Sequence, residues 1–239
     1  MEKGVAAIAS EHWYTRAASA LTGVLADPMT RLKQSDLLRI MGLKQTIVYV
    51  FAASGFRSTA HLIDLMKTYN EDGSESINVK HAAVLLMFLS LDDVTDKLMD
   101  IALHQKAELL IYLMLSWLNQ RAVLSRQGEK NRGRLLTSGH LIASVEISDR
   151  VIPAIANAWM YCSYASEPSK HDIKKYFNHI LSKRMLKANI QPKPVTHIVR
   201  KRPKVVVIHE RFVEAHAMFR CYAPLIRSLA PYFETVAVA

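Results

Sequence analysis

Apolar residues recur at helical spacing through the first two-thirds of the chain. Trp13, Ala17 and Leu21, for example, are four residues apart and fall on one face of an amphipathic helix. The same periodicity predicts helices over residues 11–25, 35–53, 59–69, 79–90, 108–124, 135–144, 151–161 and 170–187. The alternating pattern of a strand does not occur before residue 195, so we expect the first domain to be all-α.

Polar segments separate the predicted helices. Residues 70–78 (NEDGSESIN) are typical of a turn-rich loop, and residues 127–133 form a charged break. Asp92 and Asp93 are expected at the start of a further helix, where carboxylates interact favourably with the helix dipole. No segment recurs at a fixed period of about 34 residues, which argues against a tetratricopeptide solenoid.

The pattern changes at the C-terminal end of the chain. Residues 204–208 (KVVVI) are a short β-branched run, an amphipathic helical segment follows, and residues 234–239 (ETVAVA) open a second apolar run. A strand, a crossover helix and a second strand begin a doubly wound, Rossmann-like sheet. Such a sheet needs further strands, so we expect the N-terminal part of a larger enzyme. The predicted fold is mainly α, with an all-α domain over residues 1–197 and a truncated β-α-β start of a Rossmann-like domain over residues 198–239.

Composition indicates a folded, basic protein. Half of the 239 residues are apolar, which favours a packed core, and the formal net charge is +10 at neutral pH. Residues 165–239 contain 14 Lys and Arg against 5 Asp and Glu, whereas residues 1–164 are nearly balanced. This basic third suits a polyanion such as nucleic acid, a phosphorylated donor, or a solvated helix face with a basic linker. We favour the solvated face.

Cysteine usage and hydropathy indicate a cytoplasmic protein. Cys162 and Cys221 are too few for a disulfide framework and lack metal-ligand spacing, which suits a reducing compartment. The N-terminal residues lack the apolar core of a secretion signal. The most apolar window, residues 107–118, is too short to cross a bilayer, so we expect no membrane partner.

Candidate chemistry lies just after the first predicted strand. Glu210 and Arg211 follow that strand closely, and His216 and Arg220 are one turn apart on the next helix. Residues at the carboxyl end of a parallel strand contact ligands in open α/β sheets, so His216 is a candidate proton acceptor. The alternative, which spacing alone favours, is that His216 only packs at the helix start.

Two kinds of site are excluded at this position. All glycines lie at or before Gly139, so the turn after the strand has neither the dinucleotide nor the P-loop fingerprint. His209 and His216 are seven residues apart, whereas the zinc ligands of a zincin helix lie four apart. We therefore expect no metal and no cofactor.

Two other constellations are weaker candidates. Cys162 and Ser163 with His171 suggest a nucleophile, but no orienting group or oxyanion element accompanies them. His171 and His179 lie on the basic helix over residues 170–187 and suit an anion-binding face, although charge runs on helices are more often simply solvated.

Three segments resemble those of a known family. Residues 160–181 (MYCSYASEPSKHDIKKYFNHIL) and 204–220 (KVVVIHERFVEAHAMFR) resemble the cytoplasmic bacterial N-glycosyltransferases that modify high-molecular-weight adhesins. Residues 48–70 (VYVFAASGFRSTAHLIDLMKTYN) show a weaker match. The order and spacing of the three segments agree with that family along nearly the whole chain.

This resemblance implies a fold and a reaction. The family has an all-α domain packed on a GT-B fold, which consists of two Rossmann-like domains. Its members are inverting, metal-independent enzymes that transfer a hexose from a UDP-sugar to asparagine in Asn-X-Ser/Thr sequons. They are related to O-GlcNAc transferases but lack the tetratricopeptide array. The implied partners are an adhesin-like acceptor polypeptide and a UDP-sugar, and nucleic acid is not expected.

The resemblance also assigns roles to residues. The family's E-x-F-x-x-A-H segment matches Glu210, Phe212, Ala215 and His216. Its functional histidine falls on His216, so we predict His216 as catalytic and Glu210, Arg211 and Arg220 as substrate-binding. A second family histidine is replaced here by Arg211, so the contacts of that histidine do not carry over. The family's UDP-binding residues belong to the second Rossmann-like domain, so we expect this chain alone to be inactive.

A second hypothesis, from another class, is a stand-alone helical module whose basic helix binds nucleic acid or an acidic partner. A transferase fragment is expected to expose apolar strand edges at residues 205–208 and 235–238 and to aggregate. A stand-alone module is expected to stay monodisperse and to bind polyanions with a steep salt dependence.

Overall fold

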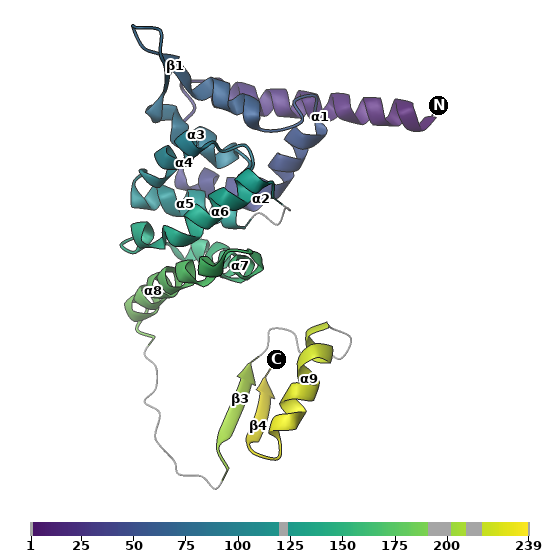
Figure 1. Ribbon diagram of the computed structural model, residues 1–239, viewed down its shortest axis with the longest axis vertical. Coiled ribbons are helices and arrows are strands. Elements are labelled where there is room, and N and C mark those ends of the chain that lie inside the picture. The colour runs from purple at the N-terminus through teal and green to yellow at the C-terminus, as the bar shows by residue number, and fades with distance from the viewer. Residues whose placement is uncertain (1, 120–123, 191–201, 209–216, 239) are drawn as a thin grey trace. The chain divides into compact units, whose positions relative to one another are not determined.

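The chain divides into two compact units, residues 1–190 and 191–239. The computed structural model describes residues 2–119, 124–190, 202–208 and 217–238 (Figure 1). Helices dominate the first unit and a β-α-β element forms the second, so the predicted mainly-α fold class is confirmed. The predicted domain boundary between residues 197 and 198 lies outside the described residues.

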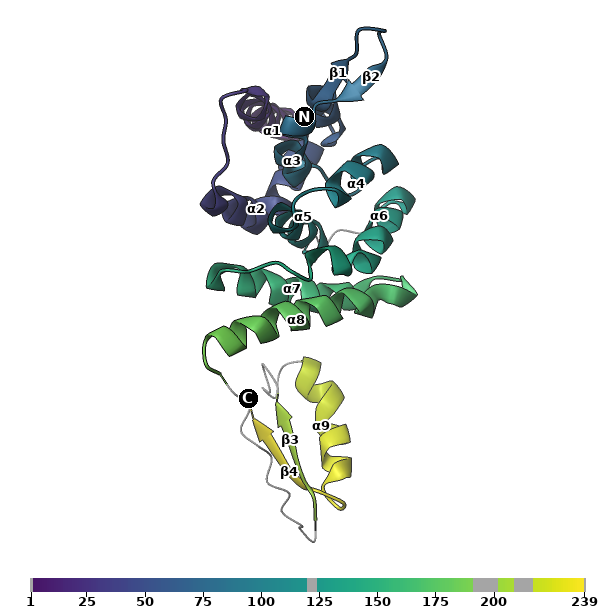
Figure 2. The ribbon, with the colours of Figure 1, turned by 90° about the vertical axis from the view of Figure 1, so that its left-hand side faces the viewer.

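The first unit is a stack of helices with one small hairpin. Its α-helices are α1 (Glu2–Ala26), α2 (Gln34–Ala53), α3 (Val79–Phe88), α4 (Asp96–Leu103), α5 (Ala107–Leu118), α6 (Arg126–Thr137), α7 (Ile152–Tyr161) and α8 (Asp172–Lys187). Its short 3-10 helices are η1 (Ala60–Met66), η2 (Gly139–Ile142), η3 (Asp149–Val151), η4 (Cys162–Tyr164) and η5 (Pro168–His171). Figure 2 shows α7 and α8 side by side at the end of the stack opposite the hairpin.

Helix α5 is the centre of the core. Its residues 110–118 are all buried, as expected for a helix that is apolar on every side. It contacts α2, α3 and α7 as well as η2. Trp117 donates from Nε1 to the carbonyl oxygen of Leu89 at 2.9 Å, so the polar atom of this buried ring has a partner.

The connection between α3 and α4, residues 89–95, is fixed by buried polar side chains and is called the anchored segment below. Lys44 of α2 donates from Nζ to the carbonyl oxygens of Met87, at 2.7 Å, and of Leu89. Burial lowers the pKa of Lys44 well below its ordinary value, although the charge of Asp93 opposes the shift. The two carbonyls lie at the C-terminal end of α3, where helical partners are lacking and the helix dipole favours a donor.

Further side chains hold the middle of the anchored segment. Asp93 Oδ2 accepts hydrogen bonds from the backbone N–H of Thr59, at 2.9 Å, and from the hydroxyl of Thr59. The buried side chain of Asn131 in α6 donates to the carbonyl oxygens of Leu91 and Val94, at 3.0 and 2.7 Å. The anchored segment therefore ties α2, η1, α5 and α6 into one unit.

The helix predicted over residues 59–69 is wrong. The structure has the 3-10 helix η1, then strand β1 (Lys67–Tyr69), a turn and strand β2 (Glu75–Ile77). The two strands pair antiparallel, and Gly73 in the turn has a φ of 78°. The expected polar loop is thus a β-hairpin, and the first domain is not strictly all-α. The turn chemistry of Asn70 and Gly73 overrides the helical spacing of the apolar residues before it.

The charged break predicted over residues 127–133 is also wrong, because α6 runs through it. The hydroxyl of Ser125 accepts from the backbone N–H of Gly128 at 3.1 Å and caps the helix. The face of α6 that turns inward carries Gly128 and Asn131 before Leu135. A glycine and an amide take the place of apolar residues, so this helix has a buried face without the usual periodicity.

Helix α4 begins later than predicted. Thr95 is its N-cap residue, and the Thr95 side chain accepts a backbone hydrogen bond in the first turn. Asp92 and Asp93 do not start the helix. They accept hydrogen bonds from the backbone N–H groups of Ser125 and Thr59, at 2.6 and 2.9 Å, and so connect segments distant in sequence.

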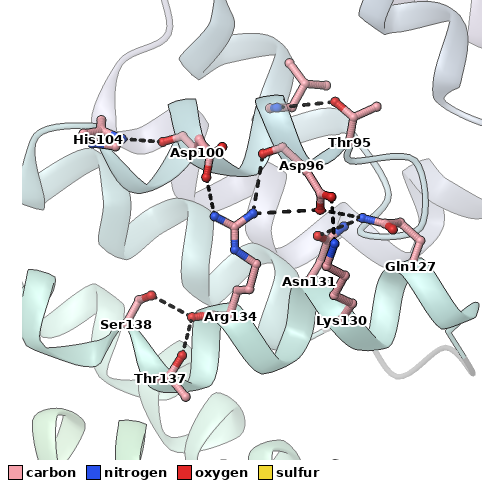
Figure 3. A network of polar contacts seen from close by, with 11 residues as sticks. Thr95, Asp96, Asp100, His104, Gln127, Lys130, Asn131, Arg134, Thr137 and Ser138 are labelled. Atoms are coloured by element: carbon pink, nitrogen blue, oxygen red, sulfur yellow. Dashed lines mark hydrogen bonds and ion pairs between the residues drawn. The ribbon is translucent and has the colours of Figure 1, made fainter.

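Helices α4 and α6 are also joined by an exposed polar network, drawn in Figure 3. Asp96 accepts from Lys130 Nζ at 2.7 Å and from Gln127 Nε2 at 3.2 Å, and Arg134 pairs with Asp100. The bond from Lys130 is the main cause that lowers the pKa of Asp96. Because these pairs are exposed, the network aligns two surface helices more than it stabilises the core.

Close packing at Gly139 in η2 gives a stability prediction. A Cβ at this position would overlap the ring of Tyr176 and lie 2.9 Å from Cδ1 of the buried Ile173, both on α8. We expect Gly139→Ala to lower the free energy of unfolding by about 1–3 kcal/mol, measured by urea denaturation. Gly23→Ala in exposed helix α1, where nothing lies within 4 Å, is the control and is expected to stabilise by about 0.5–1 kcal/mol. An equal response of the two variants would contradict the packing argument.

The second unit contains strand β3 (Lys204–Ile208), helix α9 (Ala217–Leu229) and strand β4 (Glu234–Val238), shown in Figure 1. The strands pair in parallel, in a register that runs from Lys204 opposite Glu234 to Ile208 opposite Val238. This is the strand, helix and strand order predicted from the sequence.

Candidate functional site

The predicted site lies where β3 ends and α9 begins. Because β3 and β4 are parallel, their carboxyl ends meet at the same edge of the sheet. That edge is where open α/β sheets bind ligands. The local fold thus agrees with the position expected for a substrate contact.

Of the four predicted site residues, the structure describes one. Arg220 lies in the first turn of α9, and its side chain is exposed. Glu210, Arg211 and His216 lie outside the described residues. Their roles, and that of Arg220, stay predictions.

Helix α9 is amphipathic and buries one apolar face. Phe219, Ala223 and Ile226 are buried or half-buried and are three or four residues apart, whereas Arg220 is exposed. Pro224 inside the helix has no N–H, so the carbonyl oxygen of Arg220 does not receive the usual helical hydrogen bond. The first turn of α9 therefore presents a cation and a backbone acceptor at the same residue.

The two strands of this unit have no further strand partner among the described residues. In the part of the chain that the structure describes, β3 and β4 pair only with each other. In β3, Val206 is 52% exposed and Val205 is half-buried. An open parallel strand of this kind is a place where further sheet can pair.

The suggested nucleophile at Cys162 is not supported by its surroundings. Burial raises the pKa of the Cys162 thiol to about 11, and the unreactive thiol form predominates at neutral pH. Ser163 Oγ accepts a hydrogen bond from Lys174 Nζ at 2.6 Å, and the same ammonium lies 4.1 Å from the ring centroid of Trp159. These contacts fix α8 against η4 and α7, while His171 is exposed. The cluster therefore has a structural explanation.

Cations on the basic helix α8 are paired within the helical unit. Arg184 binds Asp149 through two hydrogen bonds, of which the one from Nη2 to Oδ2 is 2.6 Å long. Lys175 Nζ lies 3.0 Å from the carboxylate of Asp172. His179 is exposed. These pairs support the solvated-face interpretation of the helix over an anion-binding face.

The pair between Arg184 and Asp149 predicts a pH dependence of stability. The hydrogen bonds from Arg184 lower the pKa of Asp149 below its ordinary value of 3.8. A carboxyl whose folded-state pKa is depressed stabilises the fold above its unfolded pKa, and this contribution is lost as the pH falls through the folded value. We expect the urea midpoint of Asp149→Asn to lie below that of the unsubstituted protein at pH 7, and the two to converge as the pH falls through the lowered pKa of Asp149.

The control for this experiment is Glu71→Gln in the hairpin loop. Glu71 is exposed and makes no ion pair in the described part of the chain. Its midpoint should match the unsubstituted protein across the same pH range. A constant separation between Asp149→Asn and the unsubstituted protein down to pH 2 would contradict the assigned role of the carboxylate.

None of the described helices is both long and apolar enough to span a membrane. No group of three or more His, Cys, Asp or Glu side chains within the described ranges is arranged to hold a metal ion. His209 and His216, whose spacing was considered above, lie outside these ranges.

Comparison with known proteins defines the class to which the helical unit is similar. A family model described as HMW1 domain 2 matches residues 100–185. The match runs from within α4 to near the end of α8, so it covers the centre of the helical core and the basic helix. This family-model match therefore lies within the helical unit.

Two curated relatives extend the similarity to nearly the whole chain. A UDP-glucose:protein N-beta-glucosyltransferase of Actinobacillus pleuropneumoniae serotype 5b (strain L20) is 22% identical over 235 residues, which cover 93% of this chain and 37% of the relative. The protein of the same name from serotype 7 (strain AP76) is 22% identical over 220 residues, which cover 87% of this chain and 35% of the relative. The chain thus spans little more than a third of the length of either relative.

The predicted resemblance to the bacterial N-glycosyltransferases of the adhesin-modifying type is confirmed by these matches. The two relatives are named as protein N-glucosyltransferases, which agrees with the reaction class that the resemblance implies.

The structure also assembles a cavity that the sequence did not predict. Arg39 of α2 and Arg150 of η3 line it together with Asn119 after α5. These residues are far apart in the sequence and belong to no local motif. Only the packing of α2, α5 and α7 brings them together.

Proposed function

We propose that this chain is the N-terminal part of an inverting, metal-independent protein N-glycosyltransferase. The complete enzyme is proposed to transfer a hexose from a UDP-sugar to asparagine in Asn-X-Ser/Thr sequons of adhesin-like proteins. The observation that carries the proposal is the similarity to protein N-glucosyltransferases over 93% of the chain. The parallel β-α-β unit after the helices supports it, because a Rossmann-like domain begins in this way.

The proposed transfer requires a proton acceptor, which we place among the residues that follow β3. In an inverting transfer, the acceptor amide nitrogen bonds to the anomeric carbon of the sugar as the bond to UDP breaks. The amide nitrogen must also lose a proton. We assign His216 as the group that accepts this proton or holds the amide by a hydrogen bond.

The neighbouring residues are assigned to substrate binding. Glu210 and Arg211 follow β3 closely in the sequence, and Arg220 lies exposed in the first turn of α9. Residues 1–239 do not include the second Rossmann-like domain of the proposed fold, which holds UDP. The chain alone is therefore proposed to be inactive, and a cytoplasmic location follows from the proposed class.

Evidence for the alternative, a stand-alone module that binds nucleic acid, is weaker. On α8, Lys175 is paired with Asp172, and Arg184 is paired with Asp149. Lys and Arg side chains bind a nucleic acid by neutralising its phosphates, which requires that they are not already neutralised by carboxylates of the protein. We therefore do not propose this second function.

The test of the proposed function begins with the coding DNA beyond codon 239. The complete encoded protein is incubated with UDP-glucose and a peptide that carries one Asn-X-Thr sequon. Mass spectrometry is expected to show one added hexose on the asparagine, with and without EDTA. A matched peptide with Gln in place of Asn is expected to stay unmodified, as is the sequon peptide incubated with residues 1–239 alone.

Two results would contradict the proposal. One is a coding sequence without a second Rossmann-like domain, and the other is a complete protein that adds no hexose to the sequon peptide.

A further inference from the structure

The helical unit contains an open cavity of about 760 Å³ between α2, the end of α5 and the start of α7. A volume of this size lies in the range of small-molecule binding sites. Every residue that lines the cavity belongs to the helical unit. The cavity is therefore distinct from the site proposed at the end of β3.

The charged side chains that line the cavity are all basic. Arg39 of α2 and Arg150 of η3 are exposed, and neither forms an ion pair within the residues that the structure describes. No Asp or Glu is among the lining residues. By contrast, Arg184 on α8 is neutralised by Asp149. Two unpaired guanidinium groups at one cavity create a positive potential that favours an anion.

The walls of the cavity are held in place by hydrogen bonds. Asn119 Nδ2 donates to the carbonyl oxygen of Ala154 at 3.1 Å, which ties the end of α5 to α7. Lys44, which also lines the cavity, is fixed by the carbonyl oxygens of Met87 and Leu89. Helices α2, α5 and α7 around the cavity are thus held in position by hydrogen bonds before a ligand binds.

Polar uncharged groups complete the lining. Gln45 and Asn157 supply amide donors and acceptors, and Leu38 and Met41 supply apolar surface. Such a mixture suits an organic molecule better than a bare ion, because it offers partners for hydroxyl or amide groups and for a carbon skeleton.

We propose that this cavity binds a small organic anion, whose phosphate or carboxylate groups are held by Arg39 and Arg150. None of the residues assigned to the transfer lines the cavity, so the proposal does not rest on the proposed function. It is a second ligand site, in the helical unit.

Isothermal titration calorimetry of residues 1–239 tests the proposal with two probes, pyrophosphate and citrate. Binding of at least one probe is expected, with an affinity that falls as NaCl is raised. The double variant Arg39→Gln, Arg150→Gln is expected to weaken this binding at least about tenfold, since each arginine makes charge-assisted hydrogen bonds. Tighter binding of pyrophosphate assigns the natural ligand to phosphates, and tighter binding of citrate assigns it to carboxylates.

The matched control is Arg126→Gln, an exposed arginine of α6 that does not line the cavity. It removes the same charge and is expected to leave probe binding unchanged. The single variants at Arg39 and Arg150 are measured as well, with circular dichroism to show that each stays folded. The proposal is overturned if neither probe binds the unsubstituted protein, or if the double variant binds as tightly as Arg126→Gln.

Discussion

His216→Ala is expected to lower the turnover of the complete protein about 100-fold or more without unfolding it. A residue that accepts a proton in the transition state typically contributes between 10²- and 10⁴-fold to the rate. The measurement is kcat for hexose transfer to a peptide with one sequon, at saturating UDP-glucose. Because His216 is proposed to act on the reacting amide, kcat should fall much more than KM rises.

The control for this variant is His179→Ala on α8. His179 is exposed and has no assigned role in the transfer, so the substitution removes an imidazole at a matched surface position. Its kcat should stay within about twofold of the unsubstituted protein, because exposed substitutions rarely perturb a fold. Unchanged turnover in His216→Ala would remove this residue from the mechanism, even if the protein proves to be a glycosyltransferase.

Lys44→Ala is expected to lower the free energy of unfolding by about 3 kcal/mol. The side chain is 2% exposed, and its ammonium group bonds the carbonyl oxygens of Met87 and Leu89. Truncation leaves the Met87 carbonyl without that donor, at a cost of about 1–3 kcal/mol. It also leaves a cavity where the aliphatic stem was, which adds a further penalty. The measurement is urea denaturation of residues 1–239, followed by circular dichroism.

A second variant separates the hydrogen bonds of Lys44 from its packing. Lys44→Met keeps a stem of similar length but donates nothing, so its loss should be smaller, about 1–2 kcal/mol. Lys97→Ala is the control, because Lys97 is exposed on α4, and its effect should stay within about 0.5 kcal/mol. If Lys44→Ala proves no more destabilising than Lys97→Ala, the anchoring role of Lys44 is wrong.

Strong local patterns were enough to predict much of the fold. Helix α5 has apolar residues on every side, and the structure buries it at the centre of the unit. The β-branched run over residues 204–208 forms β3 as predicted. Helix α2 runs through Gly42 as the predicted helix over residues 35–53 does, because a single glycine costs only about 1 kcal/mol in a helix.

The errors occurred where distant partners decide the local structure. Asn131 faces inward in α6 because the carbonyl oxygens of Leu91 and Val94 lie opposite it. Asp93 accepts a hydrogen bond from the backbone N–H of Thr59 and does not lie at a helix start. Neither relationship is visible in a local window, since it depends on how helices pack.

The candidate site was predicted in a different way. Spacing alone favoured a packing role for His216, and only the resemblance to N-glycosyltransferases made it a catalytic candidate. The cavity with Arg39 and Arg150 had no such signal, because its residues come from separate helices and form no motif.

The anchored segment has a consequence for how this protein is divided into parts. The stretch matched by the HMW1 domain 2 family begins at residue 100, just after the anchored segment. Yet Trp117 and Asn131, inside that stretch, donate their hydrogen bonds to carbonyl oxygens that precede it. The matched stretch therefore does not contain the hydrogen-bond acceptors of two of its own buried side chains. A protein truncated at residue 100 would lack the carbonyl oxygens that accept from both buried donors.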